Sequence, residues 1–100
     1  MDFFLSYVTE EDLKRERSRA REIRKSPWWK RRLSEGRCYY CGKAFSPKEL
    51  SMDHRVPLIR GGKSTKGNVV PACKDCNNKK KHMIPVEWEE YLEQIRSFED

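Results

Sequence analysis

The sequence predicts a small α+β domain in which two short strands lie between helical segments. Three observations support this fold class. The chain has 100 residues, 36% hydrophobic and 38% charged, so it can bury only a thin core. Helical patterns occupy both ends, whereas the middle alternates apolar and polar side chains as a strand does. Two Cys-x-x-Cys pairs offer the extra stabilisation that so small a core needs.

A first helix is expected from about Glu10 to Lys25. Thr9 followed by Asp12 resembles a capping box, with Asp in place of the usual Glu. Apolar residues are sparse in this segment and the remaining surface is dense in Arg and Lys. The helix therefore either faces water or touches a polyanion, and a solvated face is the more common role of such a charge run.

A second helix should begin at Ser26-Pro27, an N-cap followed by proline at the first helical position, and should stop near Gly36. Trp28 and Trp29 give this helix its apolar face. Two tryptophans on a basic helix could stack on bases. Packing against the cysteine-containing module is favoured, because these are the largest apolar side chains available here.

The middle of the chain predicts two strands and a helix. Residues 50–56 alternate apolar and polar side chains until Pro57 ends the pattern. A basic, glycine-rich loop then leads to a returning strand at residues 68–70, which Pro71 should terminate. A helix should follow over residues 74–82.

Pro85 opens a last helix whose apolar residues share one face. Trp88, Tyr91, Leu92 and Ile95 fall at i, i+3, i+4 and i+7, and the other faces are rich in Glu. We expect this helix to pack its apolar stripe on the core and to turn its acidic face outward.

The formal charge of +6 is unevenly distributed along what we take to be a single domain, residues 1–100. A basic helical extension (1–37) has 11 basic and 7 acidic side chains, a central core (38–82) has 10 and 3, and a packing helix (83–100) has 1 and 6. The basic excess lies on the central core, so nucleic acid is the natural partner. Plain solubility is the alternative explanation.

The four cysteines, Cys38, Cys41, Cys73 and Cys76, predict a structural Zn²⁺ site. The 31 residues between the pairs let them meet around a tetrahedral ion. We expect no secretory leader and no membrane span, hence a reducing cytoplasm in which thiols bind zinc rather than form disulfides. Zinc binding in small modules contributes on the order of 10 kcal/mol to folding, so the ion should decide whether this chain folds.

A second group of residues combines an acid, a histidine and an amide. Asp53 and Asn77 offer hard oxygen ligands suited to Mg²⁺ or Mn²⁺. His54 would remain free to take a proton from water near neutral pH. Because neighbouring strand residues point to opposite faces, Asp53 and His54 can reach one site only if the chain bends near residues 55–57.

The central segment resembles the HNH endonucleases, the ββα-metal nuclease family, over about residues 38–82. The matching positions are Asp53-His54, Pro57, Gly61-Gly62, Asn68, Cys73-x-x-Cys76-Asn77 and Lys80. The resemblance implies a ββα-metal core, flanked here by N-terminal helices and a C-terminal helix. It also implies that His54 is the general base and that Asp53 and Asn77 bind one catalytic divalent ion. Asn68 would hold the loop between the strands, and Asn77 stands where the namesake pattern has histidine.

The resemblance implies a metal-dependent DNA endonuclease whose products carry 5′ phosphate and 3′ hydroxyl. Six basic residues are candidates for contacts with the DNA backbone: Arg55, Arg60, Lys63, Lys66, Lys80 and Lys81. The rival is a non-catalytic zinc-ribbon module that binds DNA or assembles with a protein, but such a module has no use for Asp53, His54 and Asn77 together. The sequence leaves open a homodimer, or a partner protein from a phage or restriction system.

Overall fold

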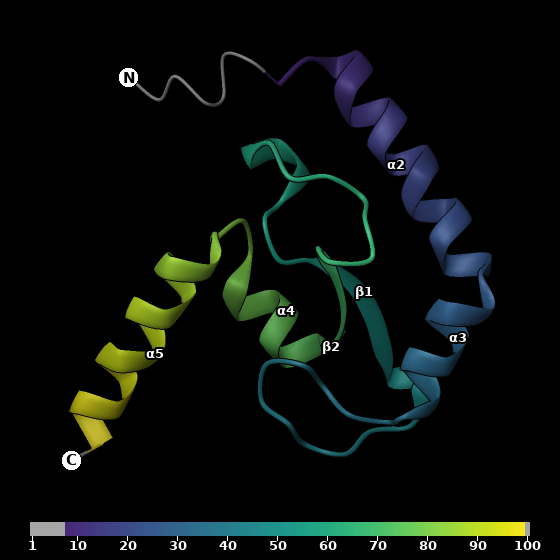
Figure 1. Ribbon diagram of the computed structural model, residues 1–100. Helices are drawn as coiled ribbons and strands as arrows, with labels where there is room; N and C mark the ends of the chain where they lie inside the picture. The colour runs from purple at the N-terminus through teal and green to yellow at the C-terminus, as the bar shows by residue number, and fades with distance from the viewer. Residues whose placement is uncertain (1–7, 100) are drawn as a thin grey trace.

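The computed structural model describes residues 8–99 and has the α+β architecture that the sequence predicts (Figure 1). A two-stranded antiparallel sheet and the helix that follows it form the centre, and longer helices flank this centre on opposite sides. No helix in the described range is long and apolar enough to cross a membrane. The elements are α2 (Glu10–Lys25), α3 (Pro27–Ser34), the 3-10 turn η1 (Pro47–Glu49), β1 (Leu50–His54), the 3-10 turn η2 (Leu58–Arg60), β2 (Val69–Cys73), α4 (Lys74–Lys80) and α5 (Pro85–Glu99).

The sheet corrects one prediction about where the second strand ends. Pro71 does not terminate β2 but lies inside it, opposite Met52 of β1. Both strands of a two-stranded sheet are edge strands, where proline is tolerated because an outward-facing N–H needs no partner strand. The Pro71 carbonyl oxygen accepts a hydrogen bond from the Tyr39 amide (2.9 Å), so the cysteine-containing turn is joined to this strand. The first strand ends at His54, short of the expected Val56.

The core is small and is built around the cysteines. Cys38, Leu50, Ala72, Cys73 and Cys76 form one buried cluster. Helix α4 continues directly from β2, and the Cys73 side chain caps it by accepting a hydrogen bond from the Cys76 amide (3.4 Å). The helix ends at Lys80, before the expected residue 82. Its backbone leaves the helical region at Lys81, which has a φ of 50°.

Helices α2 and α3 begin and end as their capping residues predict. Thr9 and Asp12 form both hydrogen bonds of a capping box, and the Ser26 hydroxyl caps α3. Trp29 is only 3% exposed, and α3 packs against β2. Leu33 of α3 packs against the buried cluster that contains the cysteines. Trp28 is half-buried and has cationic side chains close to its ring.

Helix α5 lies across the core from α2 (Figure 1). Trp88 is the residue of its apolar stripe that is fully buried, and its ring packs edge-to-face against Tyr40 with 5.5 Å between centroids. Tyr91, Leu92 and Ile95 are half-buried. The stripe therefore faces the core as expected, with Trp88 as its most buried member.

Candidate active site and cysteine cluster

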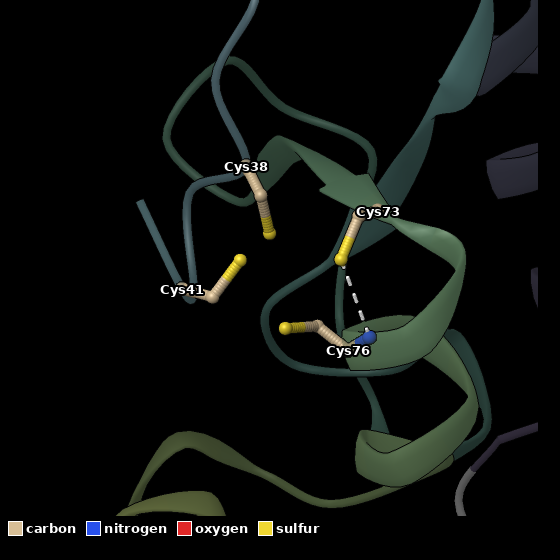
Figure 2. Close-up of side chains that lie close together, drawn as sticks. All are labelled: Cys38, Cys41, Cys73 and Cys76. Carbon is tan, nitrogen blue, oxygen red and sulfur yellow. Dashed lines mark hydrogen bonds between the residues drawn. The ribbon is translucent and has the colours of Figure 1, made fainter. Parts of the chain in front are cut away.

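The four cysteine side chains converge on one point (Figure 2). Their sulfur atoms all lie within 4.8 Å of one another, and Cys41 is the exposed member. Tetrahedral zinc with Zn–S bonds of about 2.3 Å would place its sulfur ligands about 3.8 Å apart. The donor set and its spacing fit a structural Zn²⁺, and all four ligands would be thiolates.

A tight turn places the first pair of cysteines. The Gly42 amide bonds to the Cys38 carbonyl oxygen (2.9 Å), and the Cys38 amide bonds to the Lys43 carbonyl oxygen (3.1 Å). Gly42 has a φ of 72°, a conformation that glycine adopts without a steric penalty. The second pair lies at the junction of β2 and α4. The cluster therefore joins the turn, the sheet and the first turn of α4.

Asp53, His54 and Asn77 line one hollow of about 240 Å³, which we call the catalytic hollow. Neighbouring strand residues face opposite ways, but Asp53 and His54 can reach one site because they stand at the end of β1. His54 is the last residue of β1, and the chain bends immediately afterwards at residues 55–56. Asn77 enters from α4, directly after Cys76. Lys81 and His82, both exposed, line the same hollow.

Asp53 is a buried carboxylate with two partners on one of its oxygens. Its Oδ2 atom accepts a hydrogen bond from the Tyr40 hydroxyl and pairs with the Lys80 ammonium group at 3.2 Å. Lys80 is completely buried and also donates to the His54 carbonyl oxygen (3.1 Å). Burial raises the pKa of Tyr40, and the nearby Asp53 raises it further, so Tyr40 stays a donor. No residue within 8–99 bonds to Oδ1, which is the oxygen left for a cation.

His54 is held through its Nε2 atom, which lies 2.9 Å from the Ser64 hydroxyl oxygen. The Ser64 hydroxyl donates its only hydrogen to the Glu16 carbonyl oxygen (2.6 Å), so it must accept a hydrogen bond from Nε2–H of His54. The neutral ring therefore carries its lone pair on Nδ1. Burial lowers the pKa of His54, which favours this neutral form.

Glu16 is a neighbour of the candidate site that sequence reasoning missed. It is 2% exposed, and its Oε1 atom accepts a hydrogen bond from the Ser64 amide (2.7 Å), while Oε2 pairs with Arg19 (3.0 Å). One clue was available: Glu16 lies four residues before Ala20, on the sparse apolar face of α2. An acidic residue on a buried helical face requires a partner. The sequence does not indicate that the partner is Ser64.

Asn68 holds the loop between the strands. Its side-chain amide donates to the carbonyl oxygens of Val56 (3.0 Å) and Lys63 (2.8 Å), and its Oδ1 accepts from the Val56 amide (2.9 Å). This is the place at which the resemblance implies a loop-holding asparagine. Gly62 lies in the same loop, where an added Cβ would sit 1.8 Å from the Val56 carbonyl oxygen. The loop is therefore closely packed on itself.

The six basic candidates occupy different environments. Arg60 pairs with Glu87 of α5 (2.9 Å), and Lys80 is buried against Asp53. The Arg55 guanidinium lies over the Tyr39 ring and the Lys66 ammonium over the Trp28 ring. Lys63 and Lys81 are exposed. Arg60 and Lys80 are thus engaged in ion pairs within the protein, whereas Lys63, Lys66 and Lys81 are exposed and Arg55 is half-buried.

A family model described as HNH endonuclease matches residues 38–92, more than half of the chain. No curated protein matches the chain. The matched segment includes the cysteine cluster, both strands, α4 and the first half of α5. Helices α2 and α3, and with them Glu16, lie outside it.

Proposed function

The chain belongs to the HNH endonuclease family, and on that premise we propose that it hydrolyses phosphodiester bonds in DNA with His54 as general base and one divalent ion. The observation that carries the proposal is the meeting of a carboxylate, an imidazole and an amide in the catalytic hollow. A zinc-ribbon module that only binds would not require these three side chains in one place.

We propose that the cysteine cluster holds Zn²⁺ and that this ion is structural. Four thiolates fill a tetrahedral site and leave no position for substrate. Cys76 is adjacent to Asn77, so fixing the sulfur atom of Cys76 also fixes the turn of α4 that presents the amide. Zinc would thereby support catalysis by stabilising the fold and by fixing the position of Asn77, without taking part in the reaction.

Asp53 and Asn77 are the residues that would hold the catalytic ion. Oδ1 of Asp53 and the amide oxygen of Asn77 are hard donors of the kind that Mg²⁺ and Mn²⁺ prefer. When bound, the ion would neutralise the phosphate and stabilise the departing 3′ oxygen. The Tyr40 and Lys80 contacts hold the other oxygen of Asp53 and so fix the orientation of its carboxylate.

His54 would take a proton from the attacking water on its Nδ1 atom. The oxygen of that water forms a bond to phosphorus as the bond from phosphorus to the 3′ oxygen breaks. The departing 3′ oxygen takes a proton from solvent water, which leaves a 5′ phosphate and a 3′ hydroxyl. Ser64 accepts a hydrogen bond from Nε2–H both before and after Nδ1 gains the proton. The ring therefore does not have to turn during the reaction.

Cations of the central segment would hold the backbone of the DNA. We propose this role for Lys63, Lys66 and Lys81, which are exposed, and for Arg55, which is half-buried. Lys81 also lines the catalytic hollow. Arg60 and Lys80 instead stabilise the site from within, through Glu87 and Asp53 respectively.

The test is plasmid cleavage by the zinc-loaded protein in Mg²⁺ or Mn²⁺, beside His54→Ala. Loss of a general base lowers the rate by about 10²–10⁴-fold, and we expect DNA binding to be retained. Equal cleavage by both proteins would defeat the assignment of His54. Tight DNA binding by the wild-type protein without cleavage in any divalent ion would favour the non-catalytic module.

A further inference from the structure

A second groove lies on the other side of His54. Its volume is about 420 Å³, and its walls include Arg17, Arg21 and Arg24 of α2. His54 and Leu58 line both this arginine groove and the catalytic hollow. The two cavities therefore adjoin at the proposed general base, so a ligand in the arginine groove would lie next to the catalytic hollow.

The two flanks of α2 differ in whether their arginines are paired with acidic residues. On one flank, Arg15 pairs with Asp12, and Arg19 pairs with Glu16. The other flank carries Arg17, Arg21 and Arg24, which are spaced i, i+4 and i+7 and so share one side of the helix. All three are exposed, and none forms an ion pair or side-chain hydrogen bond with another residue of the described chain.

This arrangement favours an anionic ligand with repeated charges. Neighbouring arginines without counter-charges repel one another, and a phosphate chain relieves that repulsion. Guanidinium groups bind phosphate oxygens in a bidentate manner. The arginines span seven residues, or about 10 Å of helix, which matches roughly three phosphates along one strand of duplex DNA. Burial lowers the pKa of His54 and the charge of Arg24 lowers it further, as expected if the groove and the base are close.

We propose that Arg17, Arg21 and Arg24 bind the phosphate backbone of duplex DNA next to the bond to be cut. This inference rests on the proposed function, because it takes DNA as the substrate of the same site. It assigns a role to a helix that lies outside the segment matched to the family. A solvated charged helix would leave DNA affinity unchanged when these charges are removed.

The experiment compares two triple variants of equal charge. The groove variant is Arg17→Gln, Arg21→Gln and Arg24→Gln. The control is Arg31→Gln, Lys43→Gln and Lys48→Gln, three exposed cations that do not line the arginine groove. Binding to a short duplex is measured over a series of salt concentrations without divalent ions, and circular dichroism and zinc content show that both variants are folded.

The salt dependence distinguishes the two variants. Each phosphate contact contributes about 0.9 to the magnitude of the slope of log K against log salt. The slope of the groove variant should therefore be smaller in magnitude than the wild-type slope by about 2 to 3. The control should keep the wild-type slope. Equal slopes and affinities for the two variants would overturn the inference, as would a wild-type protein without salt-dependent binding.

Binding without divalent ions also separates this inference from the proposed hydrolysis. A wild-type protein that binds DNA through the arginine groove but never cuts it would refute the nuclease and support the groove. A wild-type protein that cuts DNA, with a groove variant that binds and cuts as the control does, would refute the groove alone.

Discussion

Two hydrogen bonds in series connect the Nε2 atom of His54 to α2. Ser64 joins the ring to the backbone of Glu16, and the Ser64 amide is fixed by the Glu16 carboxylate. The family resemblance pointed to Asp53, His54 and Asn77 as one group, and all three side chains line the catalytic hollow. The Glu16–Ser64 pair was not predictable, because it joins residues 48 positions apart that no local pattern connects.

Replacing Ser64 with alanine should slow catalysis without weakening DNA binding. The Nε2–H group of His54 would lose its acceptor, and the ring could then turn or take the other tautomer. We expect kcat to fall roughly 10- to 100-fold, the range for partners that orient site residues, with KM nearly unchanged. Ser64→Thr, which keeps the hydroxyl, should recover most of the rate in the same steady-state assay. An unchanged kcat for Ser64→Ala would show that the contact does not position the base.

At the scale of elements, the starts of α2 and α3 followed from their capping residues, whereas the strand boundaries and the end of α4 did not. Thr9 and Ser26 each satisfy amides at a helix start, so local chemistry determines where α2 and α3 begin. The prediction for Pro71 was wrong because the effect of proline on a strand depends on whether its backbone nitrogen faces a partner strand. That fact belongs to the tertiary structure and is not encoded by neighbouring residues.

The loop between the strands should tolerate alanine at one glycine and not at another. A Cβ on Gly62 would sit 1.8 Å from the Val56 carbonyl oxygen, whereas a Cβ on Gly67 would meet nothing within 4 Å. We expect Gly62→Ala to lower the free energy of unfolding by about 1–3 kcal/mol or more, as overpacking does. Gly67→Ala should stay within about 0.5 kcal/mol of the wild type. Urea denaturation of zinc-loaded proteins measures both, and equal stabilities would contradict the packing described for this loop.

Removing zinc should unfold the domain rather than only inactivate it. The buried core is centred on the cysteines, and zinc modules of this size gain on the order of 10 kcal/mol from the metal. A strong chelator should abolish the helical circular dichroism signal and the activity together. Zn²⁺ but not Mg²⁺ should restore the signal, and the activity should then return once Mg²⁺ or Mn²⁺ is also added. A chelated protein that kept its helices would show that the cluster is not needed for folding.

At the scale of the whole molecule, both flanking helices, α2 and α5, attach to the loop that follows the general base. Helix α2 reaches it through Glu16 and Ser64, and α5 reaches it through Glu87 and Arg60. The molecule is flat, with extents of 45 × 40 × 18 Å, and the two helices lie on opposite sides of the core (Figure 1). The basic α2 and the acidic outer face of α5 would orient a polyanion toward the arginine groove.

The most direct test of the proposed centre is an anomalous diffraction map of zinc-loaded His54→Ala protein crystallised with a short duplex and Mn²⁺. The expected result is zinc among the four cysteine sulfur atoms and a single manganese ion between Asp53 and Asn77, next to a phosphate. Asn77→Ala should lose the manganese and keep the zinc. Manganese absent from the catalytic hollow, or bound with neither Asp53 nor Asn77 as a ligand, would contradict the proposed metal centre.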